Sequence, residues 1–288
     1  MNVGNHNAST GAAAAETRSK APSLLGMDLE FTQISDVGRV RVGNEDYLGF
    51  FEPDRPERVR SHGWMFAVAD GVGGQELGEV ASRTAVECVL EGFRTSLAGE
   101  SHHALLNRLI LSANTRIVDA GHAVGANMAT TIVACALRYD RATIAHVGDS
   151  RCFLVRRGQA VQLTRDHTLA NEQFRLGILS SSELARAETR HVLSRSLGSE
   201  LIIKPDIAEH QLFAGDVLLL CSDGLHGSVK GAEMAAILTP DAELNSAAER
   251  LVNLANERDG GDNISALIIR IRNVERVGMY RGRPYRLP

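Results

Sequence analysis

Three apolar runs that end or begin at an aspartate constrain the fold of this chain more than any other feature. Residues 217–225 read VLLLCSDGL and residues 64–74 read WMFAVADGVGG, so each run leads into Asp-Gly. Residues 259–271, DGGDNISALIIRI, have the reverse order, with Asp262 placed before an apolar run. Short apolar runs bounded by turn residues are typical of buried strands. The sequence therefore predicts carboxylates at the ends of several buried strands.

Other parts of the chain predict more strands and four helices. The β-rich runs are MFAVAD, TTIVACAL, ATIAHVG, CFLVRR, VLLLCS and ISALIIRI, and helical stretches are expected at 76–93, 102–122, 232–239 and 244–257. Strands follow one another through hairpin-like connections in HVGDSRCFLVRRGQAVQLT, which favours an antiparallel sheet over a doubly wound parallel one. The helices would then cover the outer faces of a packed pair of sheets.

The domain organisation predicted from the sequence is simple. Residues 1–27 are small and polar without apolar periodicity, so they are expected to be a flexible leader. Residues 28–272 are expected to form one domain, since no linker or internal repeat interrupts them. A polar segment at about 164–198 interrupts the strands and is expected to be a flap beside a site. Residues 273–288 are expected to be a basic tail.

Composition excludes several classes of protein. The 31 Lys and Arg against 35 Asp and Glu leave a net charge of −4, which argues against a nucleic-acid partner. No apolar run reaches the ~18 to 20 residues of a membrane span, so no span is expected. The four cysteines all have apolar neighbours and are interpreted as buried thiols: Cys88, Cys135, Cys152 and Cys221. We expect a soluble, cytoplasmic protein.

Further acidic residues accompany those at the strand ends. SDVGRVRVGNED, residues 35–46, holds Asp36, Arg41, Glu45 and Asp46, and HVGDSR holds Asp149. Gathered aspartates repel one another at low dielectric unless a cation neutralises them. Mg²⁺ and Mn²⁺ prefer carboxylates, carbonyls and water, and two such ions about 4 Å apart can clamp a phosphate and lower the pKa of a bridging water. An arginine can then pair with the phosphate oxygens.

The motifs SDVGRVRVGNED, VADGVGG, MATT, HVGDSR, CSDGL and GGDNIS occur in this order over about residues 30–271. This series resembles that of the metal-dependent protein phosphatases, the type 2C or PPM family, in its compact bacterial form. The resemblance implies an α+β fold, a four-layer α/β/β/α sandwich with two central antiparallel sheets. It also implies hydrolysis of phosphoserine or phosphothreonine in proteins by a water activated at a binuclear Mn²⁺ or Mg²⁺ centre.

The resemblance assigns metal-binding roles to matching positions. Asp70 would bridge both ions, with the Gly71 carbonyl and Glu45 at one of them and Asp223 and Asp262 at the other. Because all these carboxylate positions are filled, a pseudophosphatase that keeps only the fold as a binding module is disfavoured. The implied cofactors are two tightly bound Mn²⁺ or Mg²⁺ ions and a third, weaker one.

Other matching positions have roles around the metals. Arg41 would bind the substrate phosphate, and Asp46 would hold a metal-bound water. Asp149 matches the aspartate that helps to hold the third ion in bacterial members. Asn263 and Thr131 match supporting positions.

Two departures from the family pattern are visible. Val72 stands where many eukaryotic relatives have a histidine proposed as the general acid, so the leaving group must be protonated by a metal-bound water or by a flap histidine, His167 or His191. Asn127 and Ala129 replace glycines that usually precede the two threonines of bacterial relatives, which affects the local turn and not the chemistry.

Rival functions receive less support. Cys88 and Arg94, and Cys135 and Arg141, have the spacing of cysteine-dependent phosphatases, but the first pair lies in a predicted helix and the second runs from a strand into a turn. A two-metal hydrolase of nucleic acids is disfavoured by the mild acidity and by the absence of a basic, aromatic-rich groove. The expected partners are a phosphoprotein substrate and a cognate bacterial Ser/Thr kinase, and the enzyme is expected to be a monomer.

Overall fold

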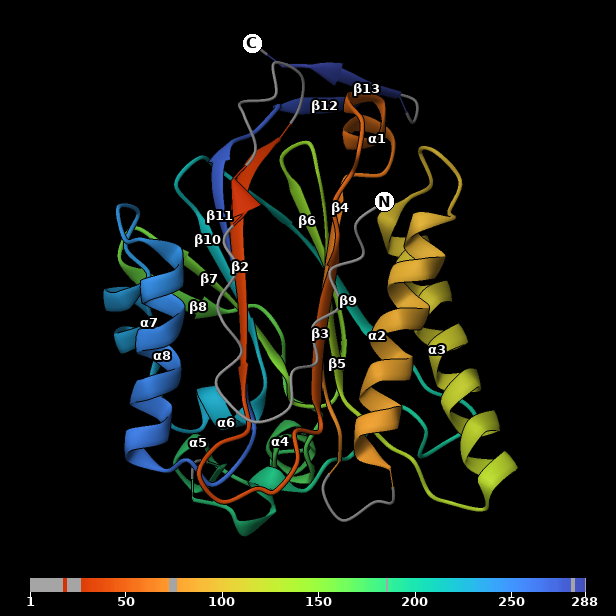
Figure 1. Cartoon of the computed structure of the whole chain (residues 1–288), viewed down its shortest axis with the longest axis vertical. Helices are drawn as coiled ribbons and strands as arrows, with labels where there is room; N and C mark the ends of the chain where they lie inside the picture. Colours follow the sequence, from red (N-terminus) through yellow and green to blue (C-terminus); the bar gives the residue numbers. More distant parts are fainter. Residues whose placement is uncertain (1–17, 20–26, 73–76, 185, 281–282, 288) are drawn as a thin grey trace.

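The computed structural model describes residues 18–19, 27–72, 77–184, 186–280 and 283–287 of the chain. Two antiparallel sheets pack face to face at the centre, and helices cover both outer faces (Figure 1). These layers are the α/β/β/α sandwich expected from the sequence, so the fold prediction is confirmed. Across the described ranges, every helix is too short or too polar to cross a membrane.

The first sheet has six strands in the order β1-β2-β11-β10-β7-β8. Their bounds are Arg18–Ser19 for β1, Asp28–Asp36 for β2, Ile264–Asn273 for β11, Val217–Cys221 for β10, Arg151–Arg156 for β7 and Gln159–Gln162 for β8. Helices α7 (Gly231–Ile237) and α8 (Leu244–Arg258) pack on its outer face, as Figure 1 shows.

The second sheet has five strands in the order β3-β4-β5-β6-β9. Their bounds are Asp46–Phe51 for β3, Trp64–Asp70 for β4, Ile132–Arg138 for β5, Arg141–Val147 for β6 and Asp206–Gln211 for β9. Helices α2 (Gly78–Arg94) and α3 (His102–Val124) cover its outer face, and the short α1 (Pro56–Ser61) joins β3 to β4.

The uninterrupted apolar runs follow from burial of both faces of each central strand. In β10, Leu218 and Leu220 point into the core between the sheets, whereas Leu219 packs against the α7–α8 layer. In β4, Phe66 belongs to the core between the sheets and Met65 to the core under α2 and α3. Because successive side chains point to opposite faces, a strand covered on both sides needs apolar residues at every position.

The four predicted helices agree with α2, α3, α7 and α8 to within two residues at each described end, while Glu76 lies outside the described residues. The sequence missed β2, β3 and β9 as strands, and it also missed β1 and the tail strands at 277–280 and 283–286. Strand β9, DIAEHQ, is a half-exposed edge strand of mostly polar residues, so it lacks the apolar signal that identified the others.

The three predicted peripheral segments lie at different places. Residues 164–198 hold α4 (Leu169–Arg175), α5 (Ser181–Leu184) and the 3-10 helix η1 (Glu188–His191), next to α6 at the end where β10 stops (Figure 1). Most of the predicted leader is outside the described residues, although β1 pairs with β2. In the predicted basic tail, β12 (Val277–Tyr280) pairs with β13 (Arg283–Arg286). The domain bounds stay a prediction.

Phe66 offers a test of the core between the sheets. It is fully buried, and its ring meets that of Phe31 edge-on with centroids 5.2 Å apart. Phe66→Ala should lower the free energy of unfolding by about 3 to 5 kcal/mol in urea titrations, because a large cavity forms where the sheets meet. Val161→Ala, at a side chain that is 54% exposed on β8, is the control and should change it by less than about 0.5 kcal/mol. Equal effects would contradict this account of the core.

Candidate active site

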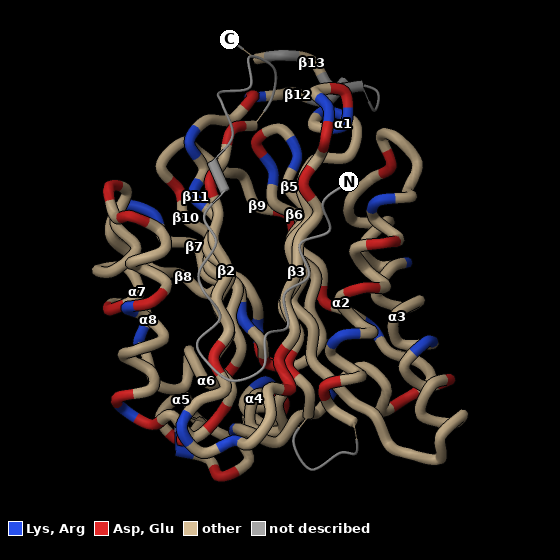
Figure 2. Tube along the Cα trace, in the orientation of Figure 1, with Lys and Arg blue, Asp and Glu red and all other residues tan. Residues whose placement is uncertain are grey.

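Aspartates from different strands meet at one end of the sandwich. Asp46 begins β3 and Asp70 ends β4, and the two residues lie opposite each other in the register of the second sheet. Asp223 follows β10 and Asp262 precedes β11, which are neighbouring strands of the first sheet. Figure 2 shows acidic residues at the lower ends of both sheets. The two sheets therefore present carboxylates toward a common space.

A cavity of about 690 Å³ lies at this end. Most of the residues predicted for the site line it, namely Arg41, Asp70, Gly71, Asp149, Asp223 and Asp262. The other two lie beside it. The Glu45 carboxylate packs against Gly78, and buried Asp46 accepts a 2.7 Å hydrogen bond from the Ser222 hydroxyl through Oδ2. The fold thus brings all eight predicted residues together.

The carboxylates in this cluster resist ionisation. Burial raises the pKa of Asp46 to about 7, with the charges of Asp223 and Asp262 acting in the same direction and the hydrogen bond from Ser222 acting against them. Burial, followed by Asp46 and Asp223, raises the pKa of Asp70 well above its usual range. Burial and then Asp223 raise the pKa of Asp149 to about 7. Such repulsion is relieved only by protons or by a cation.

Two carboxylate oxygens in the cluster lack a hydrogen-bond donor. Among the described residues, Asp46 Oδ1 and Asp223 Oδ1 are buried and have no donor within reach. Buried oxygens are almost always satisfied, and oxygens of this type are the ligands that hard divalent cations prefer. The residues present therefore fit Mn²⁺ or Mg²⁺.

Arg41 is the cationic side chain of this cavity nearest the carboxylates. Its Nη2 donates to Asp262 Oδ2 at 2.9 Å, and the side chain is 39% exposed. A half-exposed guanidinium can exchange a carboxylate for a phosphate at little cost, since both anions accept paired hydrogen bonds.

Asn263 and Thr131 hold the backbone around the cluster. The Asn263 amide donates to the carbonyls of Val37 and Gly43 at 2.9 and 3.0 Å and accepts from the Glu45 amide at 2.8 Å. The Thr131 hydroxyl accepts a hydrogen bond from the Asp70 amide at 3.0 Å. The Asn263 side chain thus fastens the loop that carries Arg41 and Glu45.

Sequence reasoning missed three other supporting residues. Ser222 joins Asp46 to β11, because its hydroxyl also accepts from the Ser265 amide at 3.0 Å. Asn44 caps the start of β3 by accepting from the Asp46 amide. His226 hydrogen-bonds the Asp149 carbonyl at 3.0 Å. Ser222 lies within the motif CSDGL, whereas His226 carries no sequence signal because it contacts a loop that is distant in the sequence.

The glycines beside the aspartates permit close backbone approach. A Cβ on Gly71 would lie 2.5 Å from the backbone of Gly78 and 2.9 Å from the Glu45 carbonyl oxygen. A Cβ on Gly224 would lie 2.2 Å from the Asn263 carbonyl oxygen. The segment after β10 is not a tight turn, as its Asp-Gly suggested, but a short helix, α6 (Asp223–His226). The backbone of α6 can then pack directly on the start of β11.

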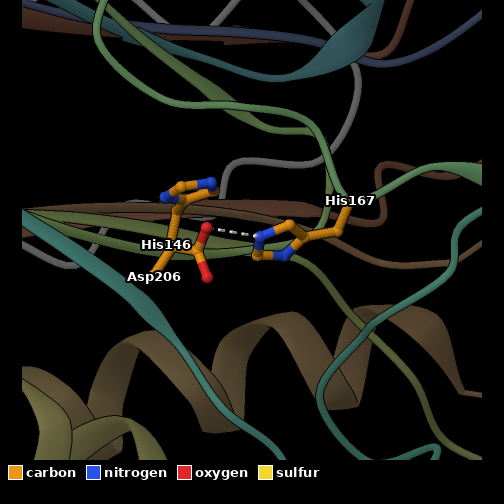
Figure 3. A group of neighbouring side chains, drawn as sticks. All are labelled: His146, His167 and Asp206. Carbon is orange, nitrogen blue, oxygen red and sulfur yellow. Dashed lines mark ion pairs between the residues drawn. The ribbon is translucent and has the colours of Figure 1, made fainter. Parts of the chain in front are cut away.

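Of the two histidines named for leaving-group protonation, His191 lines the cavity, whereas His167 is buried and its ring stacks on His146 with centroids 4.7 Å apart. Figure 3 shows His167 facing Asp206, with 3.4 Å between Nε2 and a carboxylate oxygen. The geometry favours His191 over His167 for contact with a substrate.

The cluster of His146, His167 and Asp206 has ligand atoms within 4.8 Å of one another. Its hydrogen bonds do not favour a cation, because His167 Nδ1 accepts from the Gly148 amide at 3.2 Å. The proton of neutral His167 is then on Nε2, facing Asp206, whereas a histidine ligand normally donates from its second nitrogen. These residues instead join β6 and β9 to the Gly148 loop.

The cysteine-dependent mechanism is incompatible with this structure. Cys88 lies within α2 and Cys135 within β5, and both are buried. Burial raises the pKa of Cys135, which suppresses its thiolate. Arg94 pairs with Glu91, and Arg141 is near Asp140, so neither arginine faces its cysteine in a phosphate loop.

Comparison with known proteins agrees with this architecture. A family model described as Protein phosphatase 2C matches residues 44–259. Serine/threonine phosphatase stp of Listeria innocua is 35% identical over 254 residues, covering 86% of this chain and 96% of that protein. The structure of the S. agalactiae serine/threonine phosphatase superimposes with a TM-score of 0.77 at 31% identity and covers 85% of this chain and 100% of that one.

A further similar structure is the catalytic domain of the serine threonine protein phosphatase PstP in complex with 2 manganese ions. It has a TM-score of 0.71 and 29% identity, and covers 85% of this chain and 99% of that one. The fold, the site and these relatives define a phosphatase acting on serine and threonine phosphate esters in proteins. The chain belongs to the protein phosphatase 2C family.

The raised pKa values predict how the stability of the metal-free protein depends on pH. Asp46 and Asp149 titrate near 7 when folded, against about 3.9 in an unfolded chain, so the folded state binds more protons between these values. Their contribution is present below about pH 4 and is lost as the pH rises through about 7. In chelator, the melting temperature should therefore fall from pH 5 to pH 8, and Asp46→Asn should reduce the slope. A rising melting temperature would contradict the proposed protonation.

Proposed function

We propose that the chain hydrolyses phosphoserine and phosphothreonine in proteins with a water activated at a binuclear Mn²⁺ or Mg²⁺ centre. The observation that carries the proposal is the cluster of carboxylates around a cavity that also contains Arg41; two of them have a buried oxygen for which the described residues supply no donor. The similarity to PstP, whose structure holds 2 manganese ions, supports the same cofactor here.

Five residues would hold the two ions. Asp70 would bridge them, the Gly71 carbonyl and Glu45 would complete one site, and Asp223 and Asp262 the other. When bound, the ions neutralise the carboxylates and the phosphate and lower the pKa of a water. The backbone contact of Gly71 with Glu45 supports the first set of ligands, and that of Gly224 with Asn263 supports the second, because each contact joins the ends of neighbouring strands of one sheet.

The remaining residues would act on the substrate and the water. Arg41 would leave Asp262 and pair with two phosphate oxygens. Asp46 would orient the attacking water through Oδ1, since Ser222 occupies Oδ2. Asp149 would help to hold a third, weaker ion. With Val72 unable to donate a proton, His191 or a metal-bound water would protonate the leaving hydroxyl.

The chemistry of the substrate identifies its source. Phosphoserine and phosphothreonine in proteins are made by Ser/Thr kinases, so we expect a cognate kinase, bacterial as the relatives are. The four free, buried thiols fit a reducing cytoplasm. That the enzyme is a monomer stays a prediction. A phosphoproteome comparison between wild-type cells and cells with Asp223→Asn would identify the substrates.

Metal removal tests the central proposal. The purified protein should hydrolyse a phosphothreonine peptide with added Mn²⁺ or Mg²⁺, and a chelator should abolish this activity reversibly. Iodoacetamide should have little effect, because all four cysteines are buried. Full activity in chelator, combined with loss on alkylation, would reject the two-metal proposal.

Arg41→Ala should weaken substrate capture by roughly 2 to 3 kcal/mol in kcat/KM, the scale of a charge-assisted hydrogen-bond pair. Mn²⁺ affinity by titration calorimetry should stay nearly unchanged, since the side chain is not a ligand. Arg39→Ala, at an exposed position of the same loop, is the matched control. A large loss of Mn²⁺ binding in Arg41→Ala would show that the arginine organises the metal site instead.

Asp149→Ala should lower kcat on a phosphopeptide at least ~10-fold, a barrier change of about 1.4 kcal/mol, while two Mn²⁺ remain bound by metal analysis. The melting temperature should stay near that of the wild type, because His226 contacts the Asp149 carbonyl and not its side chain. An unchanged kcat in a stable variant would remove Asp149 from the catalytic residues, and a large drop in melting temperature would assign it a structural role.

A further inference from the structure

A second cavity, of about 820 Å³, adjoins the candidate active site. The two cavities share Asp149, His191 and Asp223 in their linings. Its other walls come from β7, β8, α6 and the segment at 164–198, and they include four arginines: Arg151, Arg165, Arg175 and Arg190. A substrate phosphate held by the metals would therefore lie directly beside an arginine-rich space.

The lining of this second cavity holds four arginines and three aspartates. Arg151 is neutralised by Asp166 through a paired hydrogen bond, the shorter contact being 2.6 Å. The other two acids, Asp149 and Asp223, belong to the candidate metal centre, where bound cations would offset their charge. Arg165 and Arg175 pair with acids that lie outside the lining.

Arg165 and Arg175 have exposed head groups in ion pairs at the surface. Arg165 is 60% exposed, and the nearest carboxylate oxygen of Asp206 is 3.7 Å away. Arg175 is 59% exposed and pairs with Glu172 of its own helix. Arg190 donates to the His191 ring at 2.7 Å, which links this cavity to the active site. The exposed ion pairs of Arg165 and Arg175 contribute little to stability, so these two side chains can engage another anion.

We propose that this cavity is a substrate subsite for an anionic side chain, a carboxylate or a second phosphate, close in sequence to the phosphoserine or phosphothreonine. The inference rests on the proposed function, since it assumes that the phosphate binds at the carboxylate cluster. An extended peptide advances at most ~3.3 to 3.6 Å per residue, so a side chain within about three positions can enter an adjoining cavity. Arg165 and Arg175 would determine specificity and would not take part in the chemistry.

The test compares phosphothreonine peptides that differ at one flanking position. This position is moved, one peptide set at a time, through the three residues on either side of the phosphothreonine. That position carries Gln, Glu or a non-hydrolysable phosphonate analogue of phosphothreonine. At the best position, the wild type should show kcat/KM about three- to tenfold higher for an anionic peptide than for the Gln peptide, mainly through KM. The ratio should shrink at high salt. Preference for the phosphonate alone would identify a second phosphate as the anion, and preference for both would show that a carboxylate suffices.

The double variant, Arg165→Gln with Arg175→Gln, should bring this ratio close to one. When Arg165 is unchanged, the single variant Arg175→Lys should keep a higher ratio than the single variant Arg175→Gln. Arg94→Gln, at a surface arginine of α2 paired with Glu91, should keep the full ratio. Melting temperatures establish that each variant is folded, and the single variants replace the double one if it is not. Equal kcat/KM for all peptides in the wild type, or an unchanged ratio in the variants, would overturn the subsite.

Hydrolysis of p-nitrophenyl phosphate and of the Gln peptide by the wild type separates the two proposals. If both are hydrolysed without any preference for flanking anions, the subsite is wrong and the proposed function stands. If neither is hydrolysed with Mn²⁺ present, the proposed function fails and the subsite fails with it.

Discussion

The burial of several aspartates at one end of two packed sheets is the constraint on which this structure depends. Asp46 and Asp70 are opposite each other on paired strands, and Asp223 and Asp262 flank a second pair. Burial and repulsion between carboxylates make Asp46 and Asp70 costly to ionise, as their raised pKa values show. A fold can tolerate such a cluster only if rigid strands hold it and a proton or cation neutralises it.

That rigidity comes from neutral side chains and from backbone contacts. Asn263 fastens the loop of Arg41 to the first sheet, while Ser222 links Asp46 on the second sheet to Ser265 on the first. Gly224 brings α6 against the start of β11. The carboxylates can therefore be fixed without a salt bridge at each one, which leaves oxygens for a metal.

The segment at 164–198 adds positive charge next to an acidic centre. Arg165 and Arg175 lie at the surface, whereas His167 is buried and hydrogen-bonded to the Gly148 loop that precedes Asp149. The segment thus combines a buried anchor near the active site with an exposed rim. This separation allows residues at the rim to change substrate preference while the anchor keeps the geometry of the site.

The sequence by itself determined the central strands, the main helices and the identity of the acidic residues. Apolar runs such as those of β4 and β10 report burial on two faces, and glycines beside aspartates report close backbone approach, so both signals are local. Edge strand β9 was missed because a half-exposed strand needs no apolar run. Only the tertiary structure decided which aspartates face one another, that Asp223 begins a helix, and that His226 supports Asp149. It also placed His167 away from the cavity and the flap arginines beside it. These features depend on contacts between residues far apart in the chain, where strand pairing and sheet packing set the distances and no short sequence pattern records them.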